Sequence, residues 1–393
     1  MKNKIPYGKH FIDADDIEAV VHVLKNKNLT QGDEVESFEE AVAKYVNAKY
    51  AVAFSSWTCG LHVANIAIGI KEGDEVITSP ITFVATPNST LYCNGKPVFS
   101  DINADSVNLC VDTLEETLKK HPKAKAIIPV HFSGLPCEMK KINSLAKQYN
   151  LSIIEDAAHA LGARYEDGSM VGSCKYSDIT GFSFHPVKSI ATGEGGMITT
   201  NNKKIYENIL RLRSHGINKK SDTLVNEALA YTDGKPNPWY YEMQELGFNY
   251  RITDIQCALG ISQLKKLPKF LKKRKELVEK YDDSFSGMKH LIPIQVNQRK
   301  GSSNHLYVVR INFKNVNISR VEFMNLLKKN GIYTQVHYMP IIMHPFYKSL
   351  GYRSSNLERA SKYYEECISL PLYYSLSSSD QSRVINQVKK YIS

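Results

Sequence analysis

The chain has 393 residues, of which 42% are hydrophobic, and its formal net charge is +10. This length suffices for a large packed core and suggests one large α/β domain with a smaller companion. No apolar stretch reaches the length of a transmembrane helix, and residues 1–7 show neither a signal nor a transit pattern. We therefore expect a soluble, cytoplasmic protein with no membrane partner.

The cysteines and basic residues exclude further classes. The seven cysteines are scattered and form no C-x-x-C pair, which indicates neither a disulfide framework nor a metal site. The densest basic run, residues 265–275, has the apolar spacing of a helix, and Pro268 would be tolerated only in a first turn. A solvated helix face is the favoured interpretation over a phosphate or membrane patch. Because no basic and aromatic cluster occurs, we expect no nucleic-acid partner.

Helix and strand patterns alternate along the first half of the chain. The first predicted helix covers residues 15–25, and a second begins near Ser37, where Glu40 completes a capping box. Further on, apolar runs predict strands at 51–54, near 75, 97–100, 126–130 and 151–154, with helices at 113–119 and 139–148. This alternation predicts a mainly parallel sheet covered by helices on both faces.

The second half follows a different pattern. A helix is predicted at 205–214, and a polar loop follows from about 218 to 238. Beyond a boundary near Leu267, strands are predicted at 304–313 and 331–340, with a helix at 321–329 between them. These elements indicate a small α+β domain.

One lysine stands out in the stretch from 178 to 201. Two short strand patterns enclose a loop of small and hydroxylated residues around Lys188, and Ser183 opens this loop. Such a loop lets the backbone approach a ligand, and a partly desolvated amine in it could form a Schiff base. A solvated loop lysine is the alternative.

A carboxylate precedes this lysine in the sequence. Asp156 follows the buried strand pattern 151–154, so it lies at the carboxyl end of a predicted parallel strand, where α/β sheets bind ligands. A carboxylate there could keep a pyridinium nitrogen protonated, and His159 could reach substituents of the same ring. A helix cap for Asp156 and a buried core role for His159 are the alternatives.

Three motifs carry a family resemblance. They are E-D-A-A-H-A-L-G-A, S-F-H-P-V-K-S-I-A-T-G-E-G-G-M and L-G-F-N-Y-R-I-T-D-I-Q-C-A-L-G. With them the chain resembles the DegT/DnrJ/StrS family of sugar aminotransferases from about residue 5 nearly to the C-terminus. The resemblance implies an α/β fold of the aspartate aminotransferase type (fold type I), with a large domain (1–266), a small domain (267–393) and pyridoxal 5′-phosphate (PLP) as cofactor.

The resemblance also implies a cofactor site. Lys188 would be the catalytic lysine that binds PLP, Asp156 would hold the ring nitrogen, and Phe83 would stack on the ring. The remaining implied cofactor residues are Thr58, Cys59, His159, Ser183 and Asn249. Asn249 would reach the phosphate bound by a neighbouring subunit, which implies a homodimer with shared active sites. From the residues alone, Thr58 as an ordinary helix cap and Phe83 as a core residue stay open.

The implied substrates are a UDP-linked 4-keto sugar and L-glutamate as amino donor. Within the family, similarity is greatest to the pseudaminic acid branch, which acts on UDP-2-acetamido-2,6-dideoxy-β-L-arabino-hex-4-ulose. The candidate substrate-binding residues are Tyr7, Thr30, Gln31, Arg251, His337 and Tyr338. The alternatives are structural: residues 30–31 would be ordinary loop residues, Arg251 would form an ion pair, and residues 337–338 would be half-buried strand ends.

The sequence alone leaves other functions open. Another 4-keto sugar could be the acceptor: the D-xylo epimer, a dTDP-hexulose or a 4-keto-pentose. A PLP-dependent dehydratase would carry histidine in place of Lys188. A non-catalytic PLP-binding regulator should have lost Lys188 or Asp156, and this chain has both.

Overall fold

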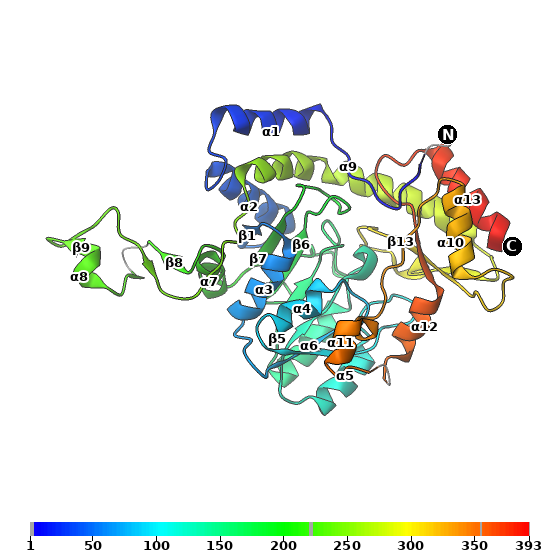
Figure 1. Cartoon of the computed structure of the whole chain (residues 1–393), viewed down its shortest axis with the longest axis horizontal. Helices are drawn as coiled ribbons and strands as arrows, with labels where there is room; N and C mark the ends of the chain where they lie inside the picture. Colours follow the sequence, from blue (N-terminus) through cyan, green and yellow to red (C-terminus); the bar gives the residue numbers. More distant parts are fainter. Residues whose placement is uncertain (1–3, 220–222, 354–355, 393) are drawn as a thin grey trace.

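A seven-stranded sheet forms the centre of the computed structural model, which describes residues 4–219, 223–353 and 356–392 (Figure 1). Its strand order is β1-β7-β6-β5-β4-β2-β3, and only β7 runs antiparallel to its neighbours. The strands are β1 (Tyr50–Phe54), β2 (Glu75–Thr78), β3 (Lys96–Phe99), β4 (Ala124–Ile128), β5 (Ser152–Asp156), β6 (Ile179–Ser183) and β7 (Gly196–Thr200). The predicted mainly parallel α/β sheet is confirmed.

Helices cover both faces of this sheet because its strands are apolar on both sides. Along β5, for example, Ile153 joins one hydrophobic cluster and Ile154 joins the other. The first cluster packs under α2 (Asp33–Val46), α5 (Val111–Lys120), α6 (Met139–Tyr149) and the first half of α9 (Asp254–Phe285). The second packs under α3 (Trp57–Ala67), α4 (Ala85–Leu91) and α7 (Lys203–Arg213).

Helix α2 begins at Asp33, four residues before the predicted start near Ser37. The carboxylate of Asp254, at the start of α9, accepts the backbone N–H groups of Gly32 and Glu34 at 3.0 and 3.1 Å. A side chain more than two hundred residues away therefore caps this helix, and the local capping box at Ser37 is not used.

Helix α9 runs without interruption from Asp254 to Phe285, so the prediction that Pro268 lies in a first turn was wrong. An interior proline costs roughly 3 kcal/mol in lost bonding and steric conflict. The helix tolerates this cost because it packs against α1 (Ala14–Asn26) and α2 before the proline and enters a second core after it. Within the described parts of the chain, neither α9 nor a shorter helix has the length and apolarity to cross a membrane.

A smaller unit follows α9. It has a three-stranded antiparallel sheet of order β12-β13-β14, formed by β12 (Leu291–Pro293), β13 (Tyr307–Ile311) and β14 (Cys367–Leu370). Its helices are α10 (Arg320–Lys329), α11 (Pro345–Ser349), α12 (Glu358–Glu366) and α13 (Ser378–Ile392). Since Leu267 belongs to the first core and Leu277 to that of the small unit, we propose that the domain division lies within α9.

The predicted strand at 331–340 is wrong. This segment pairs only through isolated bridges, Ile5 with Ile332 and Gln335 with Ser369. It runs between the N-terminal segment and β14, and each of these pairs with it at a single point. The segment instead brings Tyr338 to the large unit, where its hydroxyl lies 3.3 Å from Nε2 of His159.

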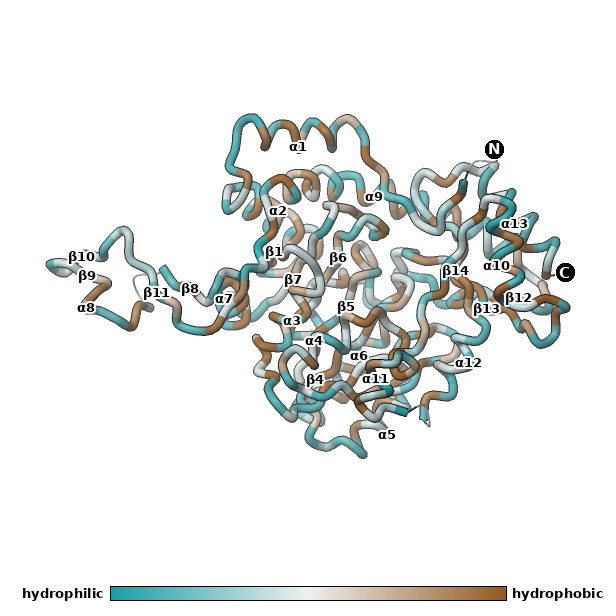
Figure 2. The backbone as a smooth tube through the Cα atoms, in the orientation of Figure 1, coloured by the Kyte–Doolittle hydropathy of each residue, from teal (hydrophilic) through white to brown (hydrophobic). Residues whose placement is uncertain are grey.

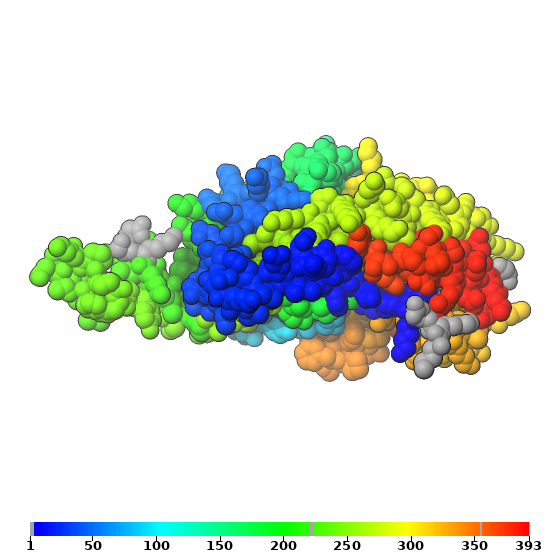
Figure 3. Space-filling view, turned by 90° about the horizontal axis from the view of Figure 1, so that it is seen from above, coloured from blue at the N-terminus to red at the C-terminus, as the bar shows by residue number. Residues whose placement is uncertain are grey.

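An arm of residues 217–219 and 223–243 projects from the body of the molecule (Figures 1 and 3). It holds β8 (Ile217–Asn218), α8 (Glu227–Ala230), β9 (Tyr231–Thr232), β10 (Lys235–Pro236) and β11 (Glu242–Met243). The predicted polar loop 218–238 therefore has short elements of its own, and residues 220–222 of it lie outside the described part. On the opposite side of the body from the arm, teal and brown alternate along the coil of α10 and α13, as in amphipathic helices (Figure 2).

Candidate active site

A cavity of about 670 Å³ opens where the carboxyl ends of β5 and β6 meet the small unit. Its walls come from α3, α4, the loop after β6, the N-terminal segment and the segment around His337. The predicted site residues that line it are Tyr7, Thr58, Phe83, Asp156, His159, Ser183, Lys188, His337 and Tyr338. Most of the candidates thus share one cavity at the edge of the sheet where parallel folds bind ligands.

The carboxylate of Asp156 is held in one orientation. Asp156 ends β5 and is 5% exposed. The Trp57 indole N–H donates to its Oδ1 at 2.9 Å, and the Thr86 hydroxyl donates to its Oδ2 at 2.6 Å. Gly181 on the adjacent strand makes room for the indole, because a Cβ there would lie 1.7 Å from the ring. The carboxylate therefore faces the cavity with a fixed geometry.

Lys188 lies half-buried in the loop after β6 and lines the same cavity. Burial lowers the pKa of its amine to about 8, although the nearby Asp156 carboxylate acts in the opposite direction. A large fraction of this amine is therefore neutral near pH 8, as a nucleophilic or proton-accepting lysine requires.

His159 has one ring nitrogen to spare. Its Nε2 lies 3.3 Å from the Tyr338 hydroxyl, while its buried Nδ1 has no hydrogen-bond partner among the residues described. Burial, and to a smaller extent the neighbouring Lys188 amine, lowers the pKa of His159 well below its ordinary value. A neutral imidazole with an unpaired nitrogen thus lines the cavity.

The start of α3 offers backbone N–H groups to the cavity. The Ser56 hydroxyl accepts the N–H of Cys59 at 3.2 Å, so that amide already has a partner. The first-turn N–H groups of Trp57 and Thr58 have no intrahelical partner, as at any helix start, and both residues line the cavity. An anion would bind here favourably.

Aromatic side chains form the rest of the wall. Phe83 is 58% exposed and its ring centroid lies 6.4 Å from that of Tyr338, so it is not a core residue. The ring of Tyr7 lies 5.4 Å from that of His337. His337 is buried, its Nδ1 lies 2.8 Å from the Ser369 hydroxyl, and burial lowers its pKa to about 3.

Five predicted residues do not line the cavity of this protomer, and one of them is Cys59, although it lies in the first turn of α3. Thr30, Gln31 and Asn249 are exposed, and Arg251 is half-buried. Thr30 forms an isolated bridge with Thr253, and Asn249 forms one with Ser214. In the described parts of one chain, none of the five lines the cavity together with Lys188.

Sequence reasoning missed Trp57, Thr86 and His305, all of which line the cavity. The signal for Thr86 was the T-F-V-A-T segment, since Thr82 and Thr86 lie four residues apart and their hydroxyls are 2.8 Å from each other. No local signal marks Trp57 or His305, whose partners are distant in sequence.

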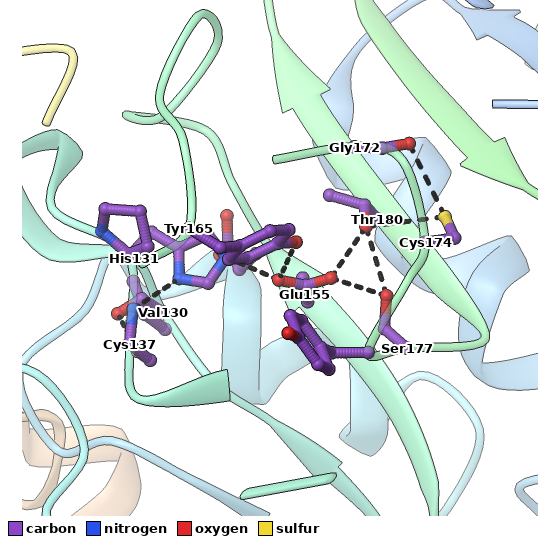
Figure 4. Close-up of polar contacts among 12 residues, drawn as sticks. Val130, His131, Cys137, Glu155, Tyr165, Gly172, Cys174, Ser177 and Thr180 are labelled. Carbon is purple, nitrogen blue, oxygen red and sulfur yellow. Dashed lines mark hydrogen bonds and ion pairs between the residues drawn. The ribbon is translucent and has the colours of Figure 1, made fainter. Parts of the chain in front are cut away.

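A second carboxylate network surrounds Glu155, which precedes Asp156 on β5 (Figure 4). Glu155 points to the other face of the sheet and is fully buried. It accepts hydrogen bonds from His131 (2.7 Å), Tyr165 (2.6 Å), Thr180 (2.9 Å) and Ser177. The N–H of Cys137 donates to Nδ1 of His131, so the ring proton of His131 is on Nε2, which donates to Glu155.

The side chains around the cavity fit PLP. A flat pyridine ring with a phosphate needs a carboxylate for its nitrogen, an aromatic wall, an anion site and an amine. The cavity has these in Asp156, Phe83, the start of α3 and Lys188, and the unpaired Nδ1 of His159 adds a group for a ring substituent.

Comparison with known proteins agrees with this chemistry. The model of the DegT/DnrJ/EryC1/StrS aminotransferase family matches residues 10–389. The UDP-4-amino-4,6-dideoxy-N-acetyl-beta-L-altrosamine transaminase of Campylobacter jejuni is 40% identical over 377 residues, which cover 96% of this chain and 94% of that protein.

Two solved structures are similar over the full length. PseC of Helicobacter pylori, an aminotransferase involved in the biosynthesis of pseudoaminic acid, has a TM-score of 0.90 and 33% identity and covers 99% of both chains. The PLP form of Spr1654 from Streptococcus pneumoniae has a TM-score of 0.87 and 29% identity, covering 99% of this chain and 98% of that one. The chain therefore belongs to the DegT/DnrJ/EryC1/StrS aminotransferase family.

Proposed function

We propose that the protein is a PLP-dependent aminotransferase that moves the amino group of L-glutamate to C4 of UDP-2-acetamido-2,6-dideoxy-β-L-arabino-hex-4-ulose. The product would be UDP-4-amino-4,6-dideoxy-N-acetyl-β-L-altrosamine, as in the name of the Campylobacter jejuni relative. The observation that carries the proposal is a partly neutral lysine, Lys188, in one cavity with the fixed carboxylate of Asp156.

Two side chains would handle the protons. When bound, PLP supplies an aldehyde that takes up the amino group and a pyridine ring that accepts an electron pair. Asp156 would keep a proton on the ring nitrogen, since its carboxylate is fixed by Trp57 and Thr86. Lys188 Nζ would accept the proton from the α-carbon of glutamate and pass it to the cofactor carbon that bears the nitrogen. In the second half it would take a proton from that carbon and deliver it to C4 of the sugar.

Other residues of the cavity would bind and orient the two ligands. Thr58 and Ser183 lie where the cofactor phosphate would meet the start of α3, and the exposed ring of Phe83 offers a face for the pyridine ring. On the other side, Tyr7, His337 and Tyr338 would contact the sugar. Both histidines, His159 and His337, are neutral, so they can donate and accept hydrogen bonds without repelling Lys188.

We propose that the active enzyme is a homodimer with shared sites. Among the residues described, Lys188 is the one lysine or arginine that lines the cavity, yet the ligands carry a phosphate and a diphosphate. A second copy could supply the missing donors, and Asn249 is exposed and does not line the cavity of its own chain. The arm also exposes apolar side chains, with Val225 at 80%, Trp239 at 73% and Met243 at 66%.

The substrate is tested in two half-reactions. Holoenzyme treated with L-glutamate should change the absorbance of its cofactor, and adding the β-L-arabino 4-keto sugar should reverse the change. Reversal only with the D-xylo epimer would move the enzyme to a neighbouring sugar pathway. If glutamate produces no change and glutamine does, the donor is wrong; if neither does, the proposed chemistry is wrong.

Lys188 is tested by substitution. The Lys188→Ala variant should lose turnover by more than about 10⁴-fold and keep its circular dichroism spectrum, because no other described residue brings a side-chain amine to the cavity. Lys314→Ala, which removes a lysine that is 86% exposed on the small unit, serves as the matched control and should keep full activity. Transamination by Lys188→Ala at the wild-type rate would contradict the assignment.

Shared sites are tested by mixing inactive variants. Lys188→Ala and Asn249→Asp would each disable every site of their own dimers. In a mixed dimer, one site would carry both changes and the other would carry neither, so activity should reappear after mixing and exchange of subunits. If mixing restores nothing although mixed dimers form, Asn249 does not act across the interface.

A further inference from the structure

A strap of residues 301–306 joins the small unit to the floor of the cavity. On entering β13, this strap runs beside the turn Phe132–Gly134 (η1) of the large unit. The N–H of Ser303 donates to the carbonyl of Gly134 at 3.0 Å, and the N–H of His305 donates to that of Ser133 at 2.8 Å. The Ser133 hydroxyl in turn donates to the carbonyl of Leu306 at 2.7 Å. The strap is therefore fixed to the large unit by its backbone.

This close approach depends on a glycine. Gly134 has φ +94°, and a Cβ there would lie 2.3 Å from the Ser303 hydroxyl and 3.0 Å from both the carbonyl of His159 and the N–H of His305. The turn, the strap and His159 thus meet at one point where no side chain fits. Their relative positions are set with little freedom.

His159 is held mainly from the small unit. The Ser303 hydroxyl donates to its backbone carbonyl at 2.7 Å, and the Tyr338 hydroxyl lies 3.3 Å from its Nε2. The ring of His305 lies against its ring, with centroids 4.5 Å apart and planes 33° apart. Three side chains from one unit therefore determine how a single imidazole of the other unit faces the cavity.

His305 is itself fixed from behind. Arg274 of α9 is 4% exposed and donates to the carbonyls of His305 and Leu372, both at 3.1 Å. Burial, together with His159 and the charges of Lys188 and Arg274, lowers the pKa of His305 well below its ordinary value. A neutral ring can stack on the neutral His159 without charge repulsion.

We propose that His305 is a positioning residue: by stacking on His159, it sets the orientation of that ring toward the bound cofactor and couples the small unit to the cavity floor. The inference rests on the proposed function, because it takes PLP as the ligand that His159 contacts. His305 would make no chemical contribution of its own. Its ring, rather than its nitrogens, would carry the effect.

The test compares three variants of the holoenzyme. His305→Ala should lower kcat about tenfold with KM for the UDP-sugar unchanged within about twofold, and should weaken the binding of PLP to apo-protein several-fold. His305→Phe keeps an aromatic ring and should recover most of both losses. His22→Ala, on the exposed side of α1, is the matched control and should behave as wild type. Ser303→Ala provides a second route to the same displacement, should His305→Ala fail to fold.

A double-mutant cycle decides whether His305 acts through His159. In a His159→Ala background, His305→Ala should cause no further loss in kcat or in PLP affinity. Multiplied losses, or wild-type PLP affinity and kcat in His305→Ala, would overturn the proposal. The titration of apo-protein with PLP uses no sugar, so it still decides the positioning role if the UDP-sugar proves not to be the substrate.

Discussion

Glu155 and Asp156 are consecutive carboxylates on β5, and their surroundings differ in one respect. Glu155 faces the α5 and α6 side, where His131, Tyr165, Ser177 and Thr180 satisfy both of its oxygens. Asp156 faces the α3 side and also accepts hydrogen bonds, but it borders a cavity. Strand alternation alone separates the two side chains.

Because their surroundings differ, we expect substitutions of Glu155 to change stability and substitutions of Asp156 to change the proposed catalysis. A closed network of buried donors leaves Glu155 nothing to offer a ligand, so removing it should affect folding. A carboxylate fixed by Trp57 and Thr86 at a cavity wall is ready to act on whatever enters, so removing it should affect chemistry. The effects of substitutions on the two faces of β5 can therefore be compared in kcat and in unfolding free energy.

The largest effect is expected from Asp156→Asn. The amide keeps the shape and can still accept one hydrogen bond, but it cannot hold a proton on the ring nitrogen of PLP. We expect kcat to fall about 10³-fold, or about 4 kcal/mol of transition-state stabilisation, while the free energy of unfolding changes by about 1 kcal/mol. Steady-state kinetics and urea unfolding of the same preparation check both. A variant that is strongly unfolded but normally active would reverse the comparison.

The mirror-image change is Glu155→Gln. The amide leaves at least two of the four buried donors facing an N–H₂ group, so the free energy of unfolding should fall by about 3 kcal/mol. Below the unfolding transition, kcat should stay within about twofold of wild type. A tenfold loss of kcat in folded Glu155→Gln would show that the two faces of β5 are not independent.

The stability difference between wild type and Glu155→Gln should also depend on pH. Burial alone would raise the pKa of Glu155, but hydrogen bonds from His131, Ser177 and Tyr165 outweigh it and lower the pKa. A lowered pKa contributes stability above the unfolded value of about 4.3, and this contribution is lost as pH falls through the folded value. The difference in unfolding free energy between wild type and Glu155→Gln should therefore be constant at neutral pH and shrink below about pH 4.

How far this comparison could be predicted from sequence depends on distance along the chain. Strand periodicity placed Asp156 at the end of β5, and a loop rich in serine and glycine marked Lys188. Trp57 and Thr86, which fix Asp156, lie 99 and 70 residues away from it, so the T-F-V-A-T segment could mark Thr86 as a site residue but could not show its contact with Asp156. The prediction of the start of α2 was wrong for the same reason, because the side chain that caps this helix, Asp254, is distant in sequence.

Replacing Lys188, a second titratable residue of the site, should make the fold more stable. Its folded pKa of about 8 lies below the unfolded value of about 10.4, so the unfolded chain binds the proton more tightly. This penalty is complete below pH 8 and fades as pH rises toward 10.4. After allowance for partial exposure, the apo form of Lys188→Met should be about 2 kcal/mol more stable than wild type at pH 7 and equal to it near pH 11.

The smallest effects come from a matched pair of threonines. Thr86 donates to Asp156 at 2.6 Å and Thr180 donates to Glu155 at 2.9 Å, and both are fully buried. Valine keeps the shape and removes the charge-assisted hydrogen bond, worth about 1–2 kcal/mol, and in both positions it also removes a contact with a neighbouring hydroxyl, that of Thr82 or of Ser177. In Thr86→Val, losing the hydrogen bond should lower kcat roughly tenfold, because the Asp156 carboxylate can rotate more freely at the cavity wall.

Thr180→Val should express the same loss in unfolding free energy instead, with kcat unchanged, because Glu155 has no contact with the cavity. Kinetics and denaturant unfolding of both variants under one set of conditions would make the comparison. If Thr180→Val slows turnover as much as Thr86→Val does, strain from the buried network reaches Asp156 through β5, and the strand transmits between its faces rather than separating them.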